Sequence, residues 1–165
     1  MQAARVLRHL FCTRWGTRRR FTREVLACIE RALEAVEGRH AGELRLAIET
    51  SFDLPELWYG VTPRQRALHV FGHLGVWDTE RNNGVLIYVL MADRDVEIVA
   101  DRAIAARVTQ AEWDAVCRDI EGHFHAGRFA EGAQSGIAAV GRLLARHFPG
   151  DGGDRNELPN KAVLL

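Results

Sequence analysis

The hydrophobic and polar positions of this chain follow two different periods, and each period predicts one type of secondary structure. Apolar residues spaced three and four positions apart are typical of amphipathic helices, and they occur in residues 22–37, 62–75, 109–127 and 128–148. The starts of three of these helices carry capping residues, namely Thr22, Thr62 followed by Pro63, and Thr109 with Glu112 three positions later. Residues 43–49 alternate between polar and apolar side chains, which predicts a half-buried strand.

A continuous apolar run at residues 85–92 has no polar face, so it predicts a strand that is covered on both sides. A polar turn follows, and a second short strand is predicted at residues 96–100, so that the two strands form a hairpin. The resulting order of elements is typical of an α/β protein, a three-layer α/β/α sandwich around a small mixed sheet. We expect one domain at residues 24–149, an arm at 1–23, and a tail at 150–165 whose apolar end docks on the domain.

The arm is basic, since residues 1–23 contain seven arginines and no acidic residue, whereas the rest of the chain carries all 22 acidic residues. Such an asymmetry indicates a partner for the arm. The candidates are the acidic body of the protein itself, an anionic membrane surface or membrane protein complex, and RNA or a transit function; DNA is not expected. No segment reaches the roughly 20 apolar residues that span a bilayer, and no secretory signal follows the basic residues. We therefore expect a cytoplasmic location, in solution or peripheral to the membrane.

Few residues offer covalent or redox chemistry. Cys12, Cys28 and Cys117 are widely spaced, which favours free buried thiols in a reducing cytoplasm. His69 and His73 have the spacing of a metal-ligand pair on a helix, but the sequence offers no obvious third ligand. The chain contains no nucleophile elbow and no glycine-rich phosphate loop that opens a helix.

Polar side chains gather at both ends of the apolar strand. In a hairpin, the loop before the first strand and the residues after the second lie at one end of the sheet, while Asp93 to Asp95 form only a turn at the other end. Carboxylate and amide oxygens are the ligands that Ca²⁺ and Mg²⁺ prefer, so the first end is a candidate divalent-cation site. Its candidate metal ligands are Asp78, Glu80 and Asp101, and its candidate binding residues are Asn82, Asn83, Gly84 and Arg102.

The same residues also have a purely structural interpretation. An Asn-Asn-Gly sequence supplies the positive backbone φ angles of a tight turn, and the carboxylates around it then act as solvated caps. The residues by themselves leave both interpretations open, an ion site and a capped sheet.

Residues 82–104 and 124–144 together resemble the TPM domain family. They contain an Asn-Gly before a buried aliphatic strand, an Asp-Arg turn, and a late signature that consists here of Phe124, Gly127, Phe129 and Gly132. The resemblance covers residues 41–148. Ala103 departs from it, because a glycine is common at that position.

The resemblance implies an α/β/α sandwich, calcium binding in some members, weak acid phosphatase activity in a plant member, and roles in the assembly or repair of membrane complexes. We therefore predict a TPM-type binding or assembly module with a Ca²⁺ or Mg²⁺ site at the rim of the sheet, acting at the membrane periphery. The alternative is a weak metal-dependent acid phosphatase in the same cleft, with carboxylates holding the ion and Arg102 holding the phosphate. No general base of motif strength supports that alternative.

Overall fold

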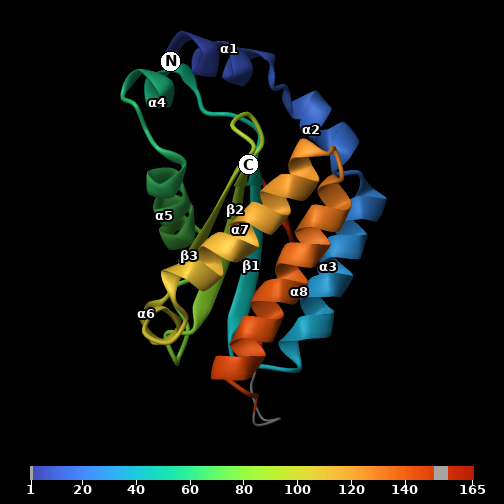
Figure 1. Cartoon of the computed structure of the whole chain (residues 1–165), viewed down its shortest axis with the longest axis vertical. Helices are drawn as coiled ribbons and strands as arrows, with labels where there is room; N and C mark the ends of the chain where they lie inside the picture. Colours follow the sequence, from blue (N-terminus) through green and yellow to red (C-terminus); the bar gives the residue numbers. More distant parts are fainter. Residues whose placement is uncertain (1, 151–155) are drawn as a thin grey trace.

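The computed structural model describes residues 2–150 and 156–165, and it has the predicted α/β/α sandwich architecture (Figure 1). Within these residues, four strands form one mixed sheet in the order β3-β2-β1-β4. β1 (Glu43–Glu49) runs parallel to β2 (Gly84–Leu90) and to β4 (Val163–Leu164), and β3 (Asp95–Ala100) is antiparallel to β2. The predicted hairpin and the central position of the apolar run, which forms β2, are confirmed.

Helices cover both faces of the sheet. α3 (Arg23–Glu37), α7 (Gln110–His125) and α8 (Phe129–His147) pack on one face. α5 (Pro63–His73) and the short α4 (Leu54–Trp58) pack on the other face, around the buried ring of Tyr88. The remaining helices are α1 (Gln2–Phe11), α2 (Arg14–Arg20) and α6 (Arg102–Ala105). In Figure 1, α1 lies across the end of the sheet where β1 and β2 finish, and α6 lies at the opposite end.

β1 differs from its prediction, because every residue of the strand is buried rather than only alternate ones. Helices cover one face of the strand, and α5 and the C-terminal segment cover the other. Both glutamates of the strand find partners there, whereas Arg45 Nε is buried without a hydrogen-bond partner among the described residues. Glu49 binds Arg66 on α5, and Glu43 accepts a hydrogen bond from the backbone N–H of Leu158 at 3.1 Å. The local sequence could not indicate the second contact, since Leu158 comes 115 residues later in the chain.

The predicted helix starts are confirmed by their hydrogen bonds. The hydroxyl oxygens of Thr22, Thr62 and Thr109 each accept from the backbone N–H of the third residue of the following helix. The three cysteines are free thiols, and each is partly buried rather than fully buried. None of the helices in the described ranges is both long and apolar enough to cross a bilayer.

α8 approaches its neighbours closely because glycines face them. A Cβ added to Gly136 would lie 2.4 Å from Ile120 Cδ1 on α7, and one added to Gly141 would lie 2.8 Å from Val36 Cβ on α3. The backbone of α8 is therefore in direct contact with side chains of both neighbours, and this fixes the helical layer behind the sheet.

Residues 156–165 fold back along β1 and are held at two places. β4 pairs with β1, and the N–H of Leu165 donates to the carbonyl of Ile48 at 2.9 Å. The side-chain amides of Asn156 and Asn160 both donate to Glu37 Oε2 at the end of α3. The predicted docking of the apolar end of the tail is confirmed, whereas residues 151–155 of the tail lie outside the described ranges.

Glu37 is expected to make the protein less stable as the pH rises toward neutrality. Burial, helped by the nearby charges of Glu43 and Glu34, raises the pKa of Glu37 to about 7 in spite of the hydrogen bond from Asn160. An unfolded glutamate titrates near pH ~4.3. Between that pH and the folded pKa, the folded state holds more protons than the unfolded state, so the stability falls as the pH rises.

The variant Glu37→Gln removes this titration and keeps an oxygen for the asparagine amides. Its melting temperature should exceed that of the parent protein at about pH 8 and approach it at about pH 4. Thermal denaturation across this range is the measurement, and Glu30→Gln, two turns earlier on α3, is the control. An unchanged pH dependence in Glu37→Gln would contradict the prediction.

Candidate functional site

The end of the sheet at which β2 begins holds the predicted rim site, and backbone hydrogen bonds bring most of its residues together. The N–H of Asp101 donates to the carbonyl of Gly84 at 2.8 Å, and the N–H of Ala103 donates to the carbonyl of Asn82 at 3.2 Å. These bonds continue the β2–β3 pairing beyond the strands. Residues 82–84 and 101–102 therefore lie side by side.

The side chains of this rim act as caps. Asp101 is the N-cap of α6, and its Oδ1 accepts from the N–H of Arg102 at 2.6 Å. Arg102 Nη2 donates to Asn82 Oδ1 at 2.9 Å. The backbone φ angle of Asn82 is 52°, which is the left-handed turn geometry expected of the Asn-Asn-Gly sequence. The structural interpretation of the rim thus holds at Asn82 and Asp101.

Two of the predicted metal ligands are solvent-facing. The side chains of Asp78 and Glu80 are exposed, and the N–H of Glu80 donates to the carboxylate of Glu157 at 3.0 Å. Two buried oxygens of the rim, Asp101 Oδ2 and Asn83 Oδ1, have no hydrogen-bond partner. Within residues 2–150 and 156–165, no group of three or more His, Cys, Asp or Glu side chains is arranged to hold a metal ion. A Ca²⁺ ion takes about six to eight oxygens, so an ion here would depend mostly on backbone carbonyls and water.

The histidine pair predicted on a helix is exposed on α5. The rings of His69 and His73 are stacked, with their centroids 6.3 Å apart. In the part of the chain that the structure describes, no third ligand joins them. The pair therefore offers two of the four ligands of a usual zinc site.

Gly84 is the tightest point of the rim. A Cβ at this position would lie 1.9 Å from the carbonyl oxygen of Val76, a backbone atom of the loop after α5 that cannot swing aside. We expect Gly84→Ala to lower the free energy of unfolding by about 1–3 kcal/mol, the usual cost of overpacking. Urea denaturation measures this. The control Gly122→Ala adds the same methyl group in α7 with nothing within 4 Å, and equal destabilisation by both substitutions would contradict the prediction.

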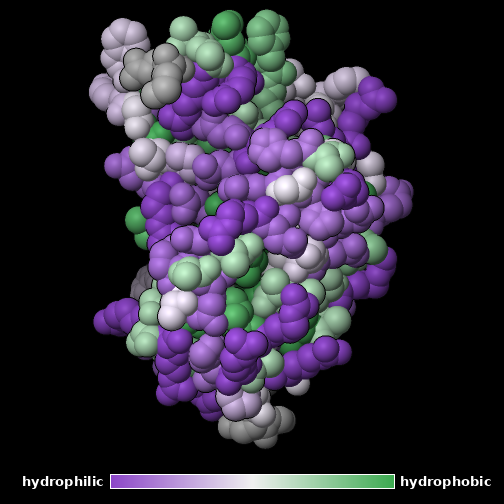
Figure 2. Space-filling view, viewed as in Figure 1, coloured by the Kyte–Doolittle hydropathy of each residue, from purple (hydrophilic) through white to green (hydrophobic). Residues whose placement is uncertain are grey.

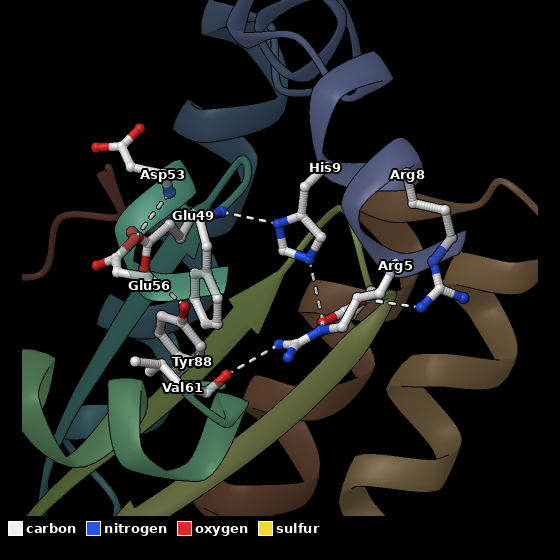
Figure 3. A network of polar contacts seen from close by, with 10 residues as sticks. Arg5, Arg8, His9, Glu49, Asp53, Glu56, Val61 and Tyr88 are labelled. Carbon is white, nitrogen blue, oxygen red and sulfur yellow. Dashed lines mark hydrogen bonds and ion pairs between the residues drawn. The ribbon is translucent and has the colours of Figure 1, made fainter. Parts of the chain in front are cut away.

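At the opposite end of the sheet, the turn between β2 and β3 anchors the N-terminal arm (Figure 3). The side chain of Asp93 is 9% exposed, and its oxygens lie 2.8 Å from Arg5 Nε, 3.0 Å from Arg8 Nη2 and 3.2 Å from His9 Nε2. The His9 ring is buried, and its Nδ1 accepts from the N–H of Phe52 at 2.9 Å. One carboxylate therefore holds three residues of α1. The sequence pattern predicted Asp93 as a turn residue only. The spacing of Arg5, Arg8 and His9 on one side of an acid-free helix is a signal for such an anchor.

A second buried network lies at the end of β1. The side chain of Glu49 is 6% exposed, and Arg66 binds it with Nε and Nη2 at 2.9 and 2.7 Å. The hydroxyl of Tyr88 donates to Glu49 Oε2 at 2.6 Å. Burial, and then this hydrogen bond to a carboxylate, raise the pKa of Tyr88. Glu49 and Tyr88 are closed to solvent and both oxygens of Glu49 are paired, so the network stabilises the contact between β1 and α5.

Exposed apolar side chains gather on the outer surface of the arm and of α4. Among the described residues, seven of the ten large apolar side chains that are exposed lie there: Leu7, Leu10, Phe11, Trp15, Leu54, Trp58 and Tyr59. Phe11 is 80% exposed and Trp58 is 85% exposed. α1 and α4 also border an apolar groove of about 700 Å³. We call this surface, formed by α1, α2 and residues 54–59, the basic-apolar end; in Figure 2 hydrophobic residues gather at the top of the molecule, over α1.

α1 places large apolar side chains in solvent. Arg5, His9 and the partly buried Val6 contact the body, whereas Leu7, Leu10 and Phe11 face solvent. A helix on the surface of a protein in water normally turns its large apolar side chains inward. The apolar side of α1 is therefore available to a partner.

Within residues 2–150 and 156–165, arginines that form no ion pair with an acidic side chain follow α1 in the chain, on α2 and at the start of α3. In the described ranges, five arginines of the arm form no ion pair with an acidic side chain: Arg14, Arg18, Arg19, Arg20 and Arg23. Two of them stack on aromatic rings, Arg19 over Trp15 at 4.6 Å and Arg20 over Phe129 at 5.3 Å. The expected pairing of the arm with the acidic body is thus found for Arg5 and Arg8. The other five arginines of the arm form no such ion pair within the described ranges.

Comparison with known proteins identifies the family. The profile of the TPM domain matches residues 18–143. The chain belongs to the TPM domain family. This TPM domain is similar to the BA42 protein from the psychrophilic bacterium Bizionia argentinensis, whose NMR structure has a TM-score of 0.78 and 32% sequence identity over 87% of this chain and 94% of that chain.

Two more distant solution structures share the fold. The N-terminal domain of a protein from P. gingivalis has a TM-score of 0.62 and 20% identity, over 78% of this chain and 81% of that chain. The N-terminal domain of the cg2496 protein from Corynebacterium glutamicum has a TM-score of 0.55 and 17% identity, over 74% of this chain and 73% of that chain. No curated protein matches the chain at a significant level. The rim lies inside the range matched by the TPM profile, whereas α1 lies outside it.

Proposed function

We propose that this TPM domain is a docking module that attaches to anionic membrane surfaces through its basic-apolar end. The observation that carries the proposal is the orientation of α1, with Leu7, Leu10 and Phe11 in solvent. Removing apolar surface from water contributes about 25 cal/mol per Å², and the boundary between headgroups and acyl chains can receive these side chains. Amphipathic helices that lie in the plane of a bilayer have the same distribution of residues.

The charge of the basic-apolar end favours an anionic surface over a neutral one. Arg14 and Arg18 of this end, and Arg23 directly after it at the start of α3, are exposed and form no ion pair with an acidic side chain in the described ranges. A basic residue close to an anionic membrane contributes about 1 kcal/mol. RNA would also attract these arginines, but its phosphate backbone offers no apolar partner to leucine side chains. The combination of arginine with exposed leucine, phenylalanine and tryptophan therefore supports lipid as the partner.

The anchor at Asp93 supports the same proposal. Because Asp93 binds Arg5, Arg8 and His9, α1 is held on the body with its apolar side outward. A helix that is already ordered avoids part of the entropic cost of binding. The arm is therefore preorganised for a surface that lies beyond the carboxyl ends of β1 and β2.

Co-sedimentation with lipid vesicles tests the proposal. The full chain is expected to bind vesicles that contain phosphatidylserine, to bind pure phosphatidylcholine vesicles weakly, and to be released by salt, which screens surface charge. The triple variant Arg14→Gln, Arg18→Gln and Arg23→Gln should lower the partition coefficient about a hundredfold, at about 1 kcal/mol per arginine. Phe11→Ser and Trp58→Ser should each lower it several-fold.

Matched controls distinguish this surface from general charge. The variant Arg31→Gln, Arg118→Gln and Arg142→Gln removes three exposed arginines of α3, α7 and α8, and Trp77→Ser removes an exposed tryptophan outside the basic-apolar end. Both controls should bind as the parent protein does. Equal binding to neutral and anionic vesicles would contradict the proposal, and so would competition by RNA together with unchanged binding of the triple variant.

A second proposal keeps the divalent-cation site at the rim. It is favoured by the two buried oxygens without a hydrogen-bond partner, Asp101 Oδ2 and Asn83 Oδ1. Calorimetric titration with Ca²⁺ and Mg²⁺ is expected to show heat in the parent protein and none in Asp101→Asn, with Asp119→Asn as the control for loss of one carboxylate. Absence of heat in the parent would end this proposal and the metal-dependent phosphatase alternative with it, since that reaction requires the same ion.

A further inference from the structure

β3 is an edge strand of the sheet. Within residues 2–150 and 156–165, β2 is its only strand neighbour. The N–H of Asp101 donates to the carbonyl of Gly84, and in an antiparallel pair every second residue bonds the partner strand. By this alternation, Val96 and Ile98 direct their backbone N–H and C=O groups away from β2. The outer edge of the sheet therefore has groups available to one more strand.

Side chains, rather than a strand, occupy these outward groups. Glu121 on α7 accepts from the N–H of Val96 at 3.3 Å, and Arg64 on α5 donates to the carbonyl of Ile98. Arg64 is 45% exposed, and its ion pair with Glu97 is 3.3 Å long. These contacts are those of long side chains at a surface, so an incoming backbone can replace them and leave both side chains hydrated.

A groove runs along this edge and is strongly acidic. It has a volume of about 250 Å³ and lies between β3 and α7. Four carboxylates line it, those of Asp95, Glu97, Asp114 and Glu121. Burial, together with the charges of Glu97 and Glu121, raises the pKa of Asp95 to about 6. Burial and the same acidic neighbours raise the pKa of the Cys117 thiol to about 12. Arg118 also lines the groove and Arg64 pairs with Glu97. The four carboxylates outnumber these two arginines, so the groove keeps a net negative charge.

We propose that the groove between β3 and α7 binds an extended peptide segment of a partner protein, rich in arginine or lysine, which adds to β3 as a further strand. Strand addition to a sheet edge takes affinity from main-chain hydrogen bonds and specificity from alternate side chains. The outward groups of Val96 and Ile98 provide the hydrogen bonds. The carboxylates of Asp95 and Glu97 on the strand and of Asp114 on α7 lie on both sides of the added strand and select basic side chains.

The groove also limits what can bind. Residues 95–98 of the lining span about 13 Å at ~3.3 Å per residue, and the volume is too small for a helix. The occupant is therefore a strand of about four residues, and basic side chains at alternate positions meet the carboxylates. This surface lies on the side of the sheet away from β4 and differs from the basic-apolar end, so the inference does not depend on membrane binding.

The experiment titrates the ¹⁵N-labelled full chain, without lipid, with an acetylated hexapeptide in which arginine alternates with threonine. Strand addition predicts amide shifts concentrated at Val96 and Ile98. A peptide of the same sequence that is N-methylated at alternate amides keeps the charge but cannot form the strand, and it should not produce these shifts.

Variants of the groove test the same binding from the side of the protein. Arg64→Gln should increase the affinity about fivefold, because it frees the carbonyl of Ile98 and removes a positive charge. Asp114→Asn should weaken binding about twofold, and Asp119→Asn, on the α8 side of α7 where it bonds Ser135, should leave it unchanged.

Three results would overturn the inference. The first is no shift at β3 with either peptide at millimolar concentration. The second is equal binding of the N-methylated peptide, which would show attraction by charge alone. The third is equal weakening by Asp114→Asn and Asp119→Asn, which would show that the groove does not select the peptide.

Discussion

Replacing Asp93 with alanine is expected to release α1 from the body of the protein. The carboxylate is almost inaccessible and holds Arg5, Arg8 and His9. Removing one partner of a buried ionic cluster costs about 3–5 kcal/mol, since the remaining charges lose their compensation. Because α1 can expose Arg5 and His9 by detaching, we expect the loss to be largest in the local stability of this helix. Hydrogen exchange of the amides of residues 5–12 measures that local stability, and urea denaturation measures the global effect.

Arg8→Gln is the matched control for this substitution. Arg8 is 59% exposed, so its pair with Asp93 contributes little, about 0–1 kcal/mol.

The contribution of Asp93 to stability depends on pH. Burial acts to raise the pKa of Asp93, but the hydrogen bonds from Arg5 and His9 outweigh it and keep that pKa below its ordinary value. The stabilisation is therefore complete above the ordinary aspartate pKa, about 3.9, and is lost as the pH falls through the lower, folded value. Exchange protection of α1 that is the same in Asp93→Ala and Arg8→Gln would refute the anchor.

Replacing Glu49 with alanine is expected to destabilise the whole domain by about 3–5 kcal/mol. Unlike α1, Tyr88 cannot leave without opening the core, because it is fully buried in β2. Loss of Glu49 leaves the Tyr88 hydroxyl without its acceptor, and among the described residues Arg66 keeps the ion pair with Glu56 at 3.2 Å. Urea and thermal denaturation should report one cooperative transition at lower stability.

A double-mutant cycle separates this network from simple loss of volume. Tyr88→Phe removes only the hydroxyl and should cost about 1 kcal/mol. If the cost of Glu49→Ala comes partly from the stranded hydroxyl, that cost should fall in the Tyr88→Phe background. Additive effects of the two substitutions would mean that the hydrogen bond between them is not responsible.

Local patterns in the sequence predicted most of the fold. The helix starts at Thr62 and Thr109 and the strand predicted at residues 85–92 depend on neighbours within a few positions. Both helix starts occur as expected, and the strand forms at Gly84–Leu90, two residues shorter at its end because the turn to β3 begins at Met91. β1 was expected to be half-buried because Glu43 and Glu49 alternate with apolar residues. Its burial depends on Arg66 and Leu158, which are distant in sequence, and no periodicity indicates such partners.

The candidate sites show the same division between local and distant information. The hairpin correctly placed Asn82 beside Arg102, because strand pairing follows from two adjacent segments. It could not indicate that Asp93 would bind the arm, since Asp93 and Arg5 are 88 residues apart. The exposure of Leu7, Leu10 and Phe11 on α1 depends on that distant bond, so the sequence showed the basic charge of the arm and not which side of the helix faces water.

The pairing of β1 with β4 bears on how the molecule folds. Ala47 meets Val163, so this side of the sheet closes across more than 110 residues of chain, and non-local pairings of this kind form slowly. Until β4 pairs, the backbone N–H and C=O groups along this edge of β1 have no partner strand. A strand of a second unfolded molecule can then pair with them. Aggregation during refolding should therefore begin at β1, and a peptide corresponding to residues 156–165 should suppress it.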